Sequence, residues 1–410
     1  MSKISKLMPK HILNGYRIID LTHVLAGPSA TRLMAEMGAE VIKVEFPPTG
    51  DIARLLPTLK NGRSAYYVQQ NRGKLSLSLN IKSPEGKKIL TKLIKSADVL
   101  IENFAPGVIG RLGFSWDVVK EINPSIVMCS LSAFGQEGEL SALPGFDYIA
   151  QAYSGIMGMI GEKEGAPSFP MAGIGDVMTG VHAFGAIGYA LLHREKTGEG
   201  QFIDVSLLDC YTHCHEINVA VYSMSEPKTI PTRSGSHHYA VCPLGLFKGK
   251  NKYICIIALQ MQWASLCRVL EREELENDVR FVDNDKRVEN SATLIDIIQD
   301  WIDSQPDDET VIRALEKERV PCAPVLNIAE VVNHPHLVER GTIRKVQDPK
   351  VGEVEMPGMP LRFSSFEHNQ ELVAAHLGEH NERILKDVGY NSEEIESFKA
   401  ENTIFSNINT

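Results

Sequence analysis

The first half of the chain alternates short apolar runs with amphipathic stretches, which predicts strands and helices in turn. Aliphatic residues recur at every second position between residues 75 and 81, as expected for a strand. Similar runs predict strands at residues 17–22, 39–46, 75–81, 98–104, 126–131 and 201–207. Helices are expected between them, at residues 29–37 and 177–193 among others. This alternation favours an α/β fold, in which helices cover a parallel sheet.

One predicted helix has a complete start signal. Ser83 suits the capping position, Pro84 the first helical position, and Glu85 the positive end of the helix dipole. The stripe at helical spacing that follows consists of Ile89, Leu90, Leu93 and Ile94. The helix at residues 177–193 is rich in glycine and alanine instead, which predicts close packing against a neighbour.

Ligands of parallel sheets bind beyond the carboxyl ends of the strands. Three loops follow predicted strands at that edge, namely His23–Pro28, Phe46–Arg54 and Asn103–Gly107. We therefore expect these loops to form the walls of a binding pocket.

The chain has 410 residues, more than one ordinary core covers, so we expect two domains. After residue 226 the pattern loosens, with Pro227, Pro231 and Pro243, which indicates a linker. A smaller α+β domain is expected to follow, and an acidic helix near the C-terminus.

Composition narrows the class of protein. The net charge of −10 argues against a nucleic-acid surface, which needs a basic patch. No apolar run approaches the ~20 residues that span a bilayer, and Met1–Lys10 precedes no apolar signal segment. Seven cysteines without a framework fit a reducing compartment. We expect a cytoplasmic protein that binds neither nucleic acid nor membrane.

Gly173-Ile-Gly175-Asp176 has two interpretations. Asp176 could simply cap the following helix, because Asp is a preferred cap residue. Alternatively, the helix start favours its ionised form, the glycines admit a substrate, and their N–H groups face a developing oxyanion. Asp176 would then be a covalent nucleophile.

Other chemical groups give weaker signals. Cys210, His213 and Cys214 could begin a zinc site, but no second pair stands at a known spacing, so buried helix cysteines are the simpler interpretation. Lys82 and Arg111 follow predicted strand or loop ends and could each bind a phosphate or remain solvated.

Eight different short motifs are distributed along the chain. They are Asp20–Pro28 (DLTHVLAGP), Gly38–Glu45 (GAEVIKVE), Gly50-Asp51, Asn71–Lys74 (NRGK), Glu102–Gly107 (ENFAPG), Gly145–Tyr148 (GFDY), Gly175-Asp176 and Gly198–Ser206 (GEGQFIDVS). In this order they resemble the family III CoA-transferases, the CaiB/BaiF family. That family includes formyl-CoA and carnitine CoA-transferases and the related α-methylacyl-CoA racemases.

The resemblance implies a Rossmann-like large domain formed by residues 1–225 and 336–410. A smaller α+β domain, at residues 226–335 with its linker, would be inserted between them. Two ring-like subunits would interlock as a homodimer.

The resemblance also implies the chemistry. Asp176 would attack an acyl-CoA thioester to form an aspartyl anhydride and then an aspartyl-CoA thioester. A free carboxylic acid, such as a dicarboxylic acid, would then take the coenzyme A from that thioester. No metal, and no cofactor beyond coenzyme A as a substrate, is expected.

The resemblance assigns a further set of residues to coenzyme A and the acyl group. They are His23, Leu25, Phe46, Leu79, Lys82, Asn103, Phe104, Ala105, Arg111, Phe146 and Asp147. Formyl-CoA transferases have Gln at Leu25, Arg at Phe46 and Lys at Pro144. The first difference weighs against oxalate-like recognition of the acceptor, and the others imply that the CoA phosphate and adenine are held differently. Leu25 and Phe46 together favour an acceptor less polar than oxalate. The run of four glycines that covers the aspartate there is missing, and Ser234–Ala240 could take a different covering role or none.

Two alternatives remain at this point. A racemase needs a His and an Asp on opposite sides of the α-carbon, but Phe146 stands at the matching His position and cannot transfer a proton. A non-catalytic acyl-CoA-binding protein would tolerate loss of Asp176, and the retention of Asp176 with its glycines weighs against it.

Overall fold

The computed structural model describes residues 11–56, 59–225, 228–368 and 370–407. The chain forms two compact units. The first comprises residues 1–156, 170–216 and 335–410, and the second comprises residues 157–169 and 217–334, in each case as far as they are described. No helix in the described ranges is both long and apolar enough to cross a membrane.

A parallel sheet of six strands forms the centre of the first unit, with the order β5-β2-β1-β6-β7-β8. Its strands are β1 (Arg17–Asp20), β2 (Glu40–Glu45), β5 (Leu75–Ser78), β6 (Val99–Glu102), β7 (Val127–Ser132) and β8 (Gln201–Ser206). Each predicted strand is present; β7 is shifted by one residue from the predicted 126–131, and the other five have shorter bounds. The chain runs outward from β1 to β5 and then resumes on the other side of β1 at β6, so a crevice opens between the ends of β1 and β6.

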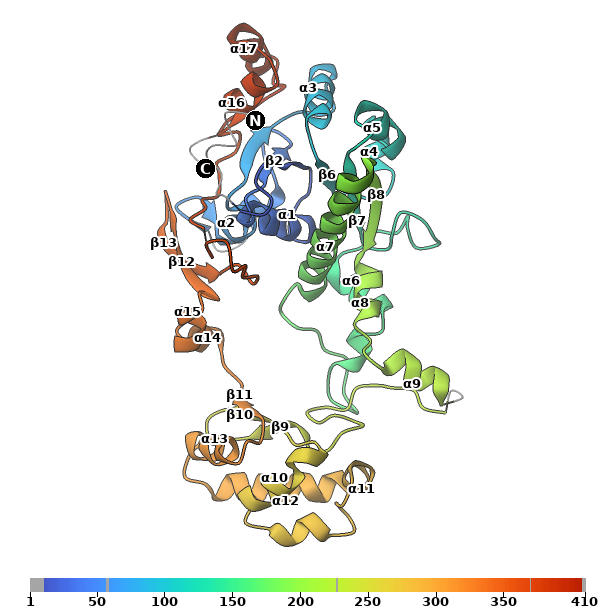
Figure 1. Cartoon of the computed structure of the whole chain (residues 1–410), viewed down its shortest axis with the longest axis vertical. Coiled ribbons are helices and arrows are strands. Elements are labelled where there is room, and N and C mark those ends of the chain that lie inside the picture. The colour runs from blue at the N-terminus through green and yellow to red at the C-terminus, as the bar shows by residue number, and fades with distance from the viewer. Residues whose placement is uncertain (1–10, 57–58, 226–227, 369, 408–410) are drawn as a thin grey trace. The chain divides into compact units, whose positions relative to one another are not determined.

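Helices cover both faces of this sheet (Figure 1). One face carries α3 (Pro84–Lys95), α4 (Val108–Arg111), α5 (Trp116–Ile122), α16 (Asn381–Asp387) and α17 (Ser392–Ala400). The other carries α1 (Ala26–Glu36) and α7 (Ile174–Thr197). The predicted start of α3 is confirmed, since the Ser83 hydroxyl accepts a hydrogen bond from the Gly86 amide and Pro84 is the first helical residue.

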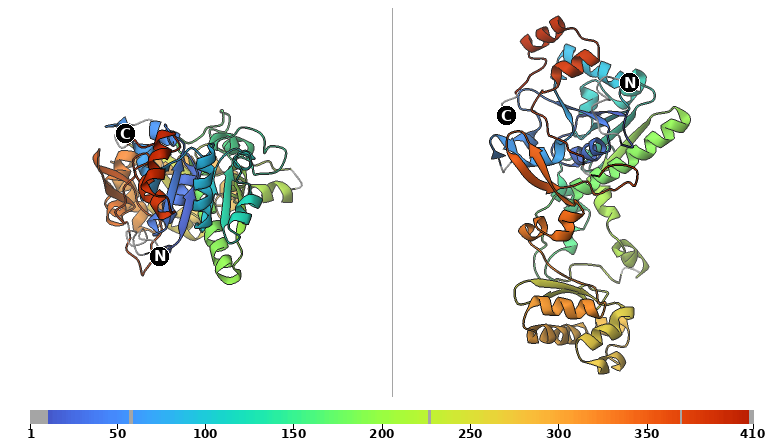
Figure 2. Two further views of the ribbon diagram at one scale, coloured as in Figure 1. Left: turned by 90° about the horizontal axis from the view of Figure 1, so that it is seen from above. Right: turned by 60° about the vertical axis from the view of Figure 1, so that its left-hand side comes forward.

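The long helix α7 runs along one side of the unit in both views of Figure 2. It crosses α1 at Gly180, where an added Cβ would lie 1.9 Å from the Ser29 hydroxyl oxygen. The expected close packing is therefore present at this glycine. α7 begins at Ile174 rather than at Val177, which places Asp176 inside the helix.

Smaller elements complete the first unit. They are β3 (Leu59–Lys60), β4 (Arg63–Ser64), α2 (Ala65–Asn71), α6 (Asp147–Tyr153), α8 (Leu207–His213), α15 (Pro335–Glu339), β12 (Ile343–Asp348) and β13 (Gly352–Pro357), with a short 3-10 helix at Ile52–Leu55. The hairpin of β12 and β13 packs against α2 through Tyr67, Val68, Val346 and Met356.

The second unit contains an antiparallel sheet in the order β11-β10-β9. Its strands are β9 (Leu244–Lys248), β10 (Tyr253–Ile257) and β11 (Cys322–Pro324), and its helices are α9 (Asn218–Met224), α10 (Trp263–Val269), α11 (Asn284–Glu289), α12 (Ser291–Ser304), α13 (Asp308–Lys317) and α14 (Ile328–Val332), with 3-10 helices at Met157–Met159, Gln260–Gln262 and Glu273–Asn277. Buried side chains such as Trp263, Phe247 and Phe281 form a core of its own.

The second unit begins at Ile217 rather than at residue 226, and it also takes in Met157–Phe169. The sequence did not suggest the second segment. The Arg233 guanidinium ties it to the unit, because it donates hydrogen bonds to the carbonyl oxygens of Glu162 and Gly165.

Candidate active site

A cavity of about 230 Å³ opens in the first unit at the carboxyl ends of the central strands. Its lining comes from the loops after β1 and β6, from the end of β7 and the loop that follows, and from the N-terminal ends of α1, α7 and α8. The lining residues are His23, Val24, Leu25, Ala26, Asn103, Leu131, Ser132, Ala133, Gly145, Phe146, Asp176, Thr179 and Leu207. Two of the three expected pocket loops contribute to it, and Phe46–Arg54 does not.

Asp176 is the third residue of α7 and does not cap that helix. The capping position belongs to Gly173, which makes no side-chain capping bond. The capping interpretation of Asp176 is therefore wrong, because the helix starts earlier than the sequence pattern indicates. The carboxylate instead faces the cavity, partly buried.

Two helices supply hydrogen-bond partners for the start of α7. The Asp176 amide donates to Oδ2 of Asp147 in α6, at 3.1 Å. The Gly175 amide donates to the hydroxyl oxygen of Tyr211 in α8, at 3.0 Å, and that hydroxyl donates to Oδ1 of Asp147. The Gly175 amide is thus occupied, so the role expected of the glycine amides as oxyanion donors does not hold for Gly175. The Asp176 amide is occupied as well.

The protonation of Asp176 also differs from expectation. Burial, and then the neighbouring Asp147 carboxylate, raise the pKa of Asp176 from 3.8 to about 7. The helix N-terminus stabilises the ionised carboxylate, but this effect is outweighed, because desolvation and a like charge both disfavour the ionised form. Asp176 is therefore poised between its two forms near neutral pH, as carboxylates at functional sites often are.

The His23 loop is held at the crevice between β1 and β6. The Asn103 amide group clamps it from the end of β6, since Oδ1 accepts from the His23 amide at 2.8 Å and Nδ2 donates to the His23 carbonyl at 2.9 Å. The next residue, Val24, has a φ of 65°, which is rare for a β-branched side chain. Such a conformation persists only where its surroundings impose it.

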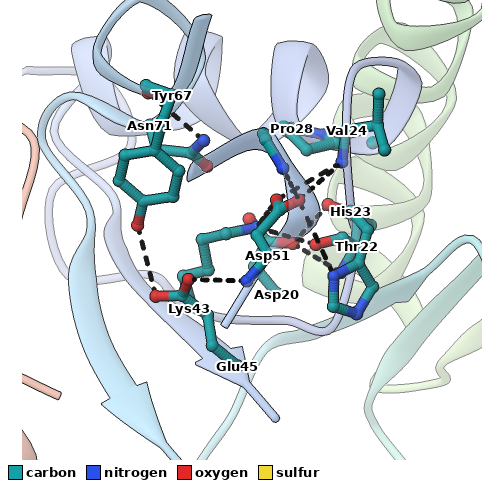
Figure 3. Close-up of polar contacts among 12 residues, drawn as sticks. Asp20, Thr22, His23, Val24, Pro28, Lys43, Glu45, Asp51, Tyr67 and Asn71 are labelled. Carbon is teal, nitrogen blue, oxygen red and sulfur yellow. Dashed lines mark hydrogen bonds and ion pairs between the residues drawn. The ribbon is translucent and has the colours of Figure 1, made fainter. Parts of the chain in front are cut away.

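Buried charged side chains next to the loop impose that conformation (Figure 3). The Val24 amide donates to Asp51, whose carboxylate pairs with the Lys43 ammonium at 2.9 Å. Lys43 Nζ also donates to the Thr22 carbonyl at 2.7 Å. Burial alone would raise the pKa of Asp51, but Lys43 and His23 outweigh it and hold that pKa well below its usual range.

Asp20 is the acceptor of a second buried group of polar contacts, next to the Lys43–Asp51 pair. Its carboxylate accepts hydrogen bonds from the hydroxyls of Thr22 and Thr31 and pairs with the Lys74 ammonium at 3.1 Å. Burial opposes the ionised form of Asp20, but the charges of Lys74 and Lys43 lower its pKa to about 2. The Asp20 carboxylate thus holds Thr22, just before the loop, and Thr31, in the helix that follows it.

The other residues expected to contact coenzyme A lie outside this cavity. Phe46 is partly exposed, and Lys82 Nζ lies 5.0 Å from the centre of its ring. The Phe104 ring lies 5.8 Å from that of His23. Ala105 and Arg111 are exposed on the same loop and on α4.

Leu79 is fully buried, and its amide donates to the Glu45 carbonyl at 2.8 Å. Its side chain packs in the core with Leu77 and Ile81. The side chain therefore does not reach the cavity, which leaves only its carbonyl for the expected backbone contact.

Sequence reasoning missed the roles of Lys43, Asp51, Asp20 and Tyr211. A signal was available for Lys43, because a lysine within an apolar strand needs a buried partner. Tyr211 lies in the segment that was considered for zinc. There Cys210 is buried, the Cys214 Sγ lies 2.8 Å from the Met178 Sδ, and no metal-holding group of His, Cys, Asp or Glu exists within the described ranges.

Comparison with known proteins gives consistent matches over nearly the whole chain. Residues 13–381 match the model of CoA-transferase family III. The human succinyl-CoA:glutarate CoA-transferase is 36% identical over 92% of this chain and 86% of its own length. The formyl-CoA:oxalate CoA-transferase of Streptomyces coelicolor is 35% identical over 97% of this chain and 100% of its own length. A CaiB/BaiF family protein from Brucella suis has a crystal structure with a TM-score of 0.80, at 31% identity, covering 92% of this chain and 99% of that chain.

Proposed function

The chain belongs to CoA-transferase family III, and from this premise we propose that it moves coenzyme A between carboxylic acids through covalent bonds to Asp176. The observation that carries the proposal is the place of Asp176, whose carboxylate faces the cavity at the start of α7. A carboxylate is a competent nucleophile toward a thioester when it is ionised and unobstructed.

In the proposed reaction, an Asp176 oxygen attacks the thioester carbon of the donor. The carbon–sulfur bond breaks, which gives a mixed anhydride and free CoA thiolate. The thiolate then attacks the Asp176 carbonyl carbon, releases the donor acid as a carboxylate, and leaves an aspartyl-CoA thioester. The acceptor carboxylate reverses these two steps, departs as the new thioester, and restores the Asp176 carboxylate.

The mostly apolar lining of the cavity suits this chemistry. Most of its lining is apolar, and the polar groups that face it are His23, Asn103, Ser132, Asp176 and Thr179. A largely apolar site excludes water, which would otherwise hydrolyse an anhydride. The remote adenosine-phosphate end of coenzyme A would supply binding energy that positions the thioester. We assign that end to residues beyond the cavity, namely the half-buried Phe104 and the exposed Phe46, Lys82, Ala105 and Arg111.

We further propose that donor and acceptor include small dicarboxylic acids. One relative is named for succinyl-CoA and glutarate, and another for formyl-CoA and oxalate. Succinate, glutarate and oxalate each carry a second carboxyl group. The apolar side chain of Leu25 in the cavity wall favours an acceptor less polar than oxalate.

We also propose that the chain works as a homodimer. The long helix α7 exposes apolar side chains that the first unit leaves uncovered, with Tyr189 exposed to 77%, Leu192 to 50% and Val181 to 49%. A second copy of the chain would bury these residues, in keeping with the interlocked dimer that the resemblance implies.

Trapping the covalent intermediate tests the proposal. Wild-type protein incubated with succinyl-CoA and hydroxylamine should yield an Asp176 hydroxamate in the peptide spectrum. Asp176→Asn should yield none and lose CoA exchange by on the order of 10³-fold or more. Asp117→Asn, on the exposed side of α5, is the matched control and should keep full activity. Exchange at the wild-type rate in Asp176→Asn would refute the mechanism.

The same assay separates the alternatives. A racemase would exchange the α-proton of a 2-methylacyl-CoA with solvent deuterium and would form no hydroxamate. Phe146 weighs against that activity, because it lines the cavity with a side chain that holds no transferable proton. A binding protein would show neither reaction.

A further inference from the structure

The Tyr211 hydroxyl lies at the centre of a chain of hydrogen bonds beneath the first turn of α7. It accepts from the Gly175 amide at 3.0 Å and donates to Oδ1 of Asp147. The second oxygen of Asp147 accepts from the Asp176 amide at 3.1 Å. Both side chains are buried, with Tyr211 exposed to 2% and Asp147 to 6%.

These hydrogen bonds take the place of the side-chain N-cap that α7 lacks. The first amides of a helix have no partner within the helix, and Gly173 offers no side chain to them. Tyr211 and Asp147 supply the partners from α8 and α6 instead. Because both Asp147 oxygens are engaged, the carboxylate cannot rotate without breaking one of these bonds.

The fit depends on the absence of a side chain at Gly175. A Cβ there would lie 2.1 Å from a ring carbon of Tyr211 and 2.8 Å from its hydroxyl oxygen. The aromatic ring therefore occupies the space beside the backbone that precedes Asp176. The position of Asp176 is thus set by packing as well as by hydrogen bonds.

The electrostatics agree with this geometry. Burial and the bond to Asp147 raise the pKa of Tyr211 well above its usual range, so it remains a proton donor. Burial, and after it the negative charges of Asp176 and Asp147, raise the pKa of Tyr66 as well, so this hydroxyl is neutral. His23 faces the same cavity from the β1 loop. Asp147 is thus the like charge that opposes ionisation of Asp176.

We propose that Tyr211 is a positioning residue for the Asp176 nucleophile, acting through the Asp147 carboxylate that it holds against the Asp176 amide. The inference rests on the proposed function of Asp176. Without the hydroxyl, Asp147 is free to turn away, so Asp176 loses both its fixed orientation and the charge that opposes its ionisation.

Tyr211→Phe removes the hydroxyl and keeps the ring, so it isolates this role. The first measurement is the pH midpoint for carbodiimide labelling of Asp176 in the full-length protein, read by peptide mass spectrometry. The midpoint should fall by about 1 pH unit in Tyr211→Phe, and Asp147→Asn should shift it in the same direction because it removes the like charge. Tyr16→Phe is the control, since it removes a hydroxyl that donates to Glu195 near the other end of α7.

The second measurement is single-turnover acylation by succinyl-CoA, with coenzyme A affinity measured separately. Acylation per folded protein should slow ~10- to 100-fold in Tyr211→Phe, while affinity stays within about twofold, because orientation changes and binding does not. Adding Tyr211→Phe to Asp147→Asn should cost far less than the product of the two single losses, since the hydroxyl acts on Asp176 chiefly through that carboxylate and otherwise accepts only from the Gly175 amide.

An unchanged labelling midpoint in Tyr211→Phe overturns the inference, as do losses that multiply in the double variant. The labelling needs no turnover, so it decides the role of Tyr211 even if wild-type protein forms no acyl-aspartate. Failure of the wild-type protein to form an acyl-aspartate would count against the proposed function, not against the role of Tyr211.

Discussion

The Nζ of Lys43 lies 2.9 Å from Oδ2 of Asp51, and neither side chain reaches solvent. This pair fixes the loop that forms one wall of the cavity, because Lys43 also binds the Thr22 carbonyl and Asp51 also binds the Val24 amide. A lysine buried in β2 and an aspartate in the loop after that strand thereby determine the backbone conformation of a loop that lines the cavity.

Asp51→Asn should destabilise the protein strongly. It leaves the buried Lys43 ammonium without its nearest carboxylate, and loss of one partner of a buried pair costs about 3–5 kcal/mol of unfolding free energy. Urea unfolding monitored by circular dichroism measures this change.

Glu309→Gln is the control for that comparison. Glu309 pairs with Arg313 on the surface of α13, with both side chains about 70% exposed, so its loss should cost about 1 kcal/mol or less. Equal costs for the two variants would show that the buried pair does not hold the loop as described.

The rate of CoA exchange should depend on pH through Asp176. Its pKa is raised to about 7, and only the ionised form attacks a thioester. The exchange rate should therefore fall as pH drops through about 7, whereas an unperturbed aspartate would remain active to about pH 5. A rate that stays constant between pH 8 and pH 5 would contradict this assignment, once stability across that range has been checked.

The same group should affect stability. Its folded pKa lies above the unfolded value of 3.8, so its contribution to stability is fully present below pH 3.8 and is lost as pH rises through about 7. Asp176→Asn removes this titration. Its melting temperature relative to wild type should therefore rise between pH 5 and pH 8, and a constant difference would argue against the raised pKa.

Gly175→Ala should disturb the active site through a steric clash. The added Cβ would lie 2.1 Å from the Tyr211 ring, so α7 or α8 must shift, at a cost of about 1–3 kcal/mol. We expect at least ~10-fold slower acylation of Asp176, because a shift of the helix start displaces the nucleophile. Gly110→Ala is the control, since its Cβ would meet only Ser115 Cβ, at 3.8 Å.

The exposed face of α7 should prove to be a contact between two copies. Tyr189→Asp places a charge at its most exposed aromatic residue and should shift the protein toward monomer in sedimentation or native mass spectrometry. Val279→Asp, at a residue of the second unit that is 79% exposed, should leave the mass distribution unchanged. Wild-type protein that sediments as a monomer would exclude the homodimer.

Local signals in the sequence were sufficient for the framework of the first unit. Apolar runs predicted the strands of the parallel sheet, and the Ser83-Pro84 start of α3 followed from capping preferences that act within a few residues. The exact start of α7 was missed, because Gly173 provides no side-chain cap and the first turn takes its partners from other helices.

By itself the sequence determined the alternation of strands and helices, the edge of the sheet at which the cavity opens, and the resemblance that singled out Asp176. Only the tertiary structure decided the state of that aspartate. Its pKa depends on burial and on Asp147, and its backbone depends on Tyr211, groups that folding brings together from separate helices. Desolvation and electrostatic interactions act through space, so no pattern of neighbouring residues along the chain could disclose them.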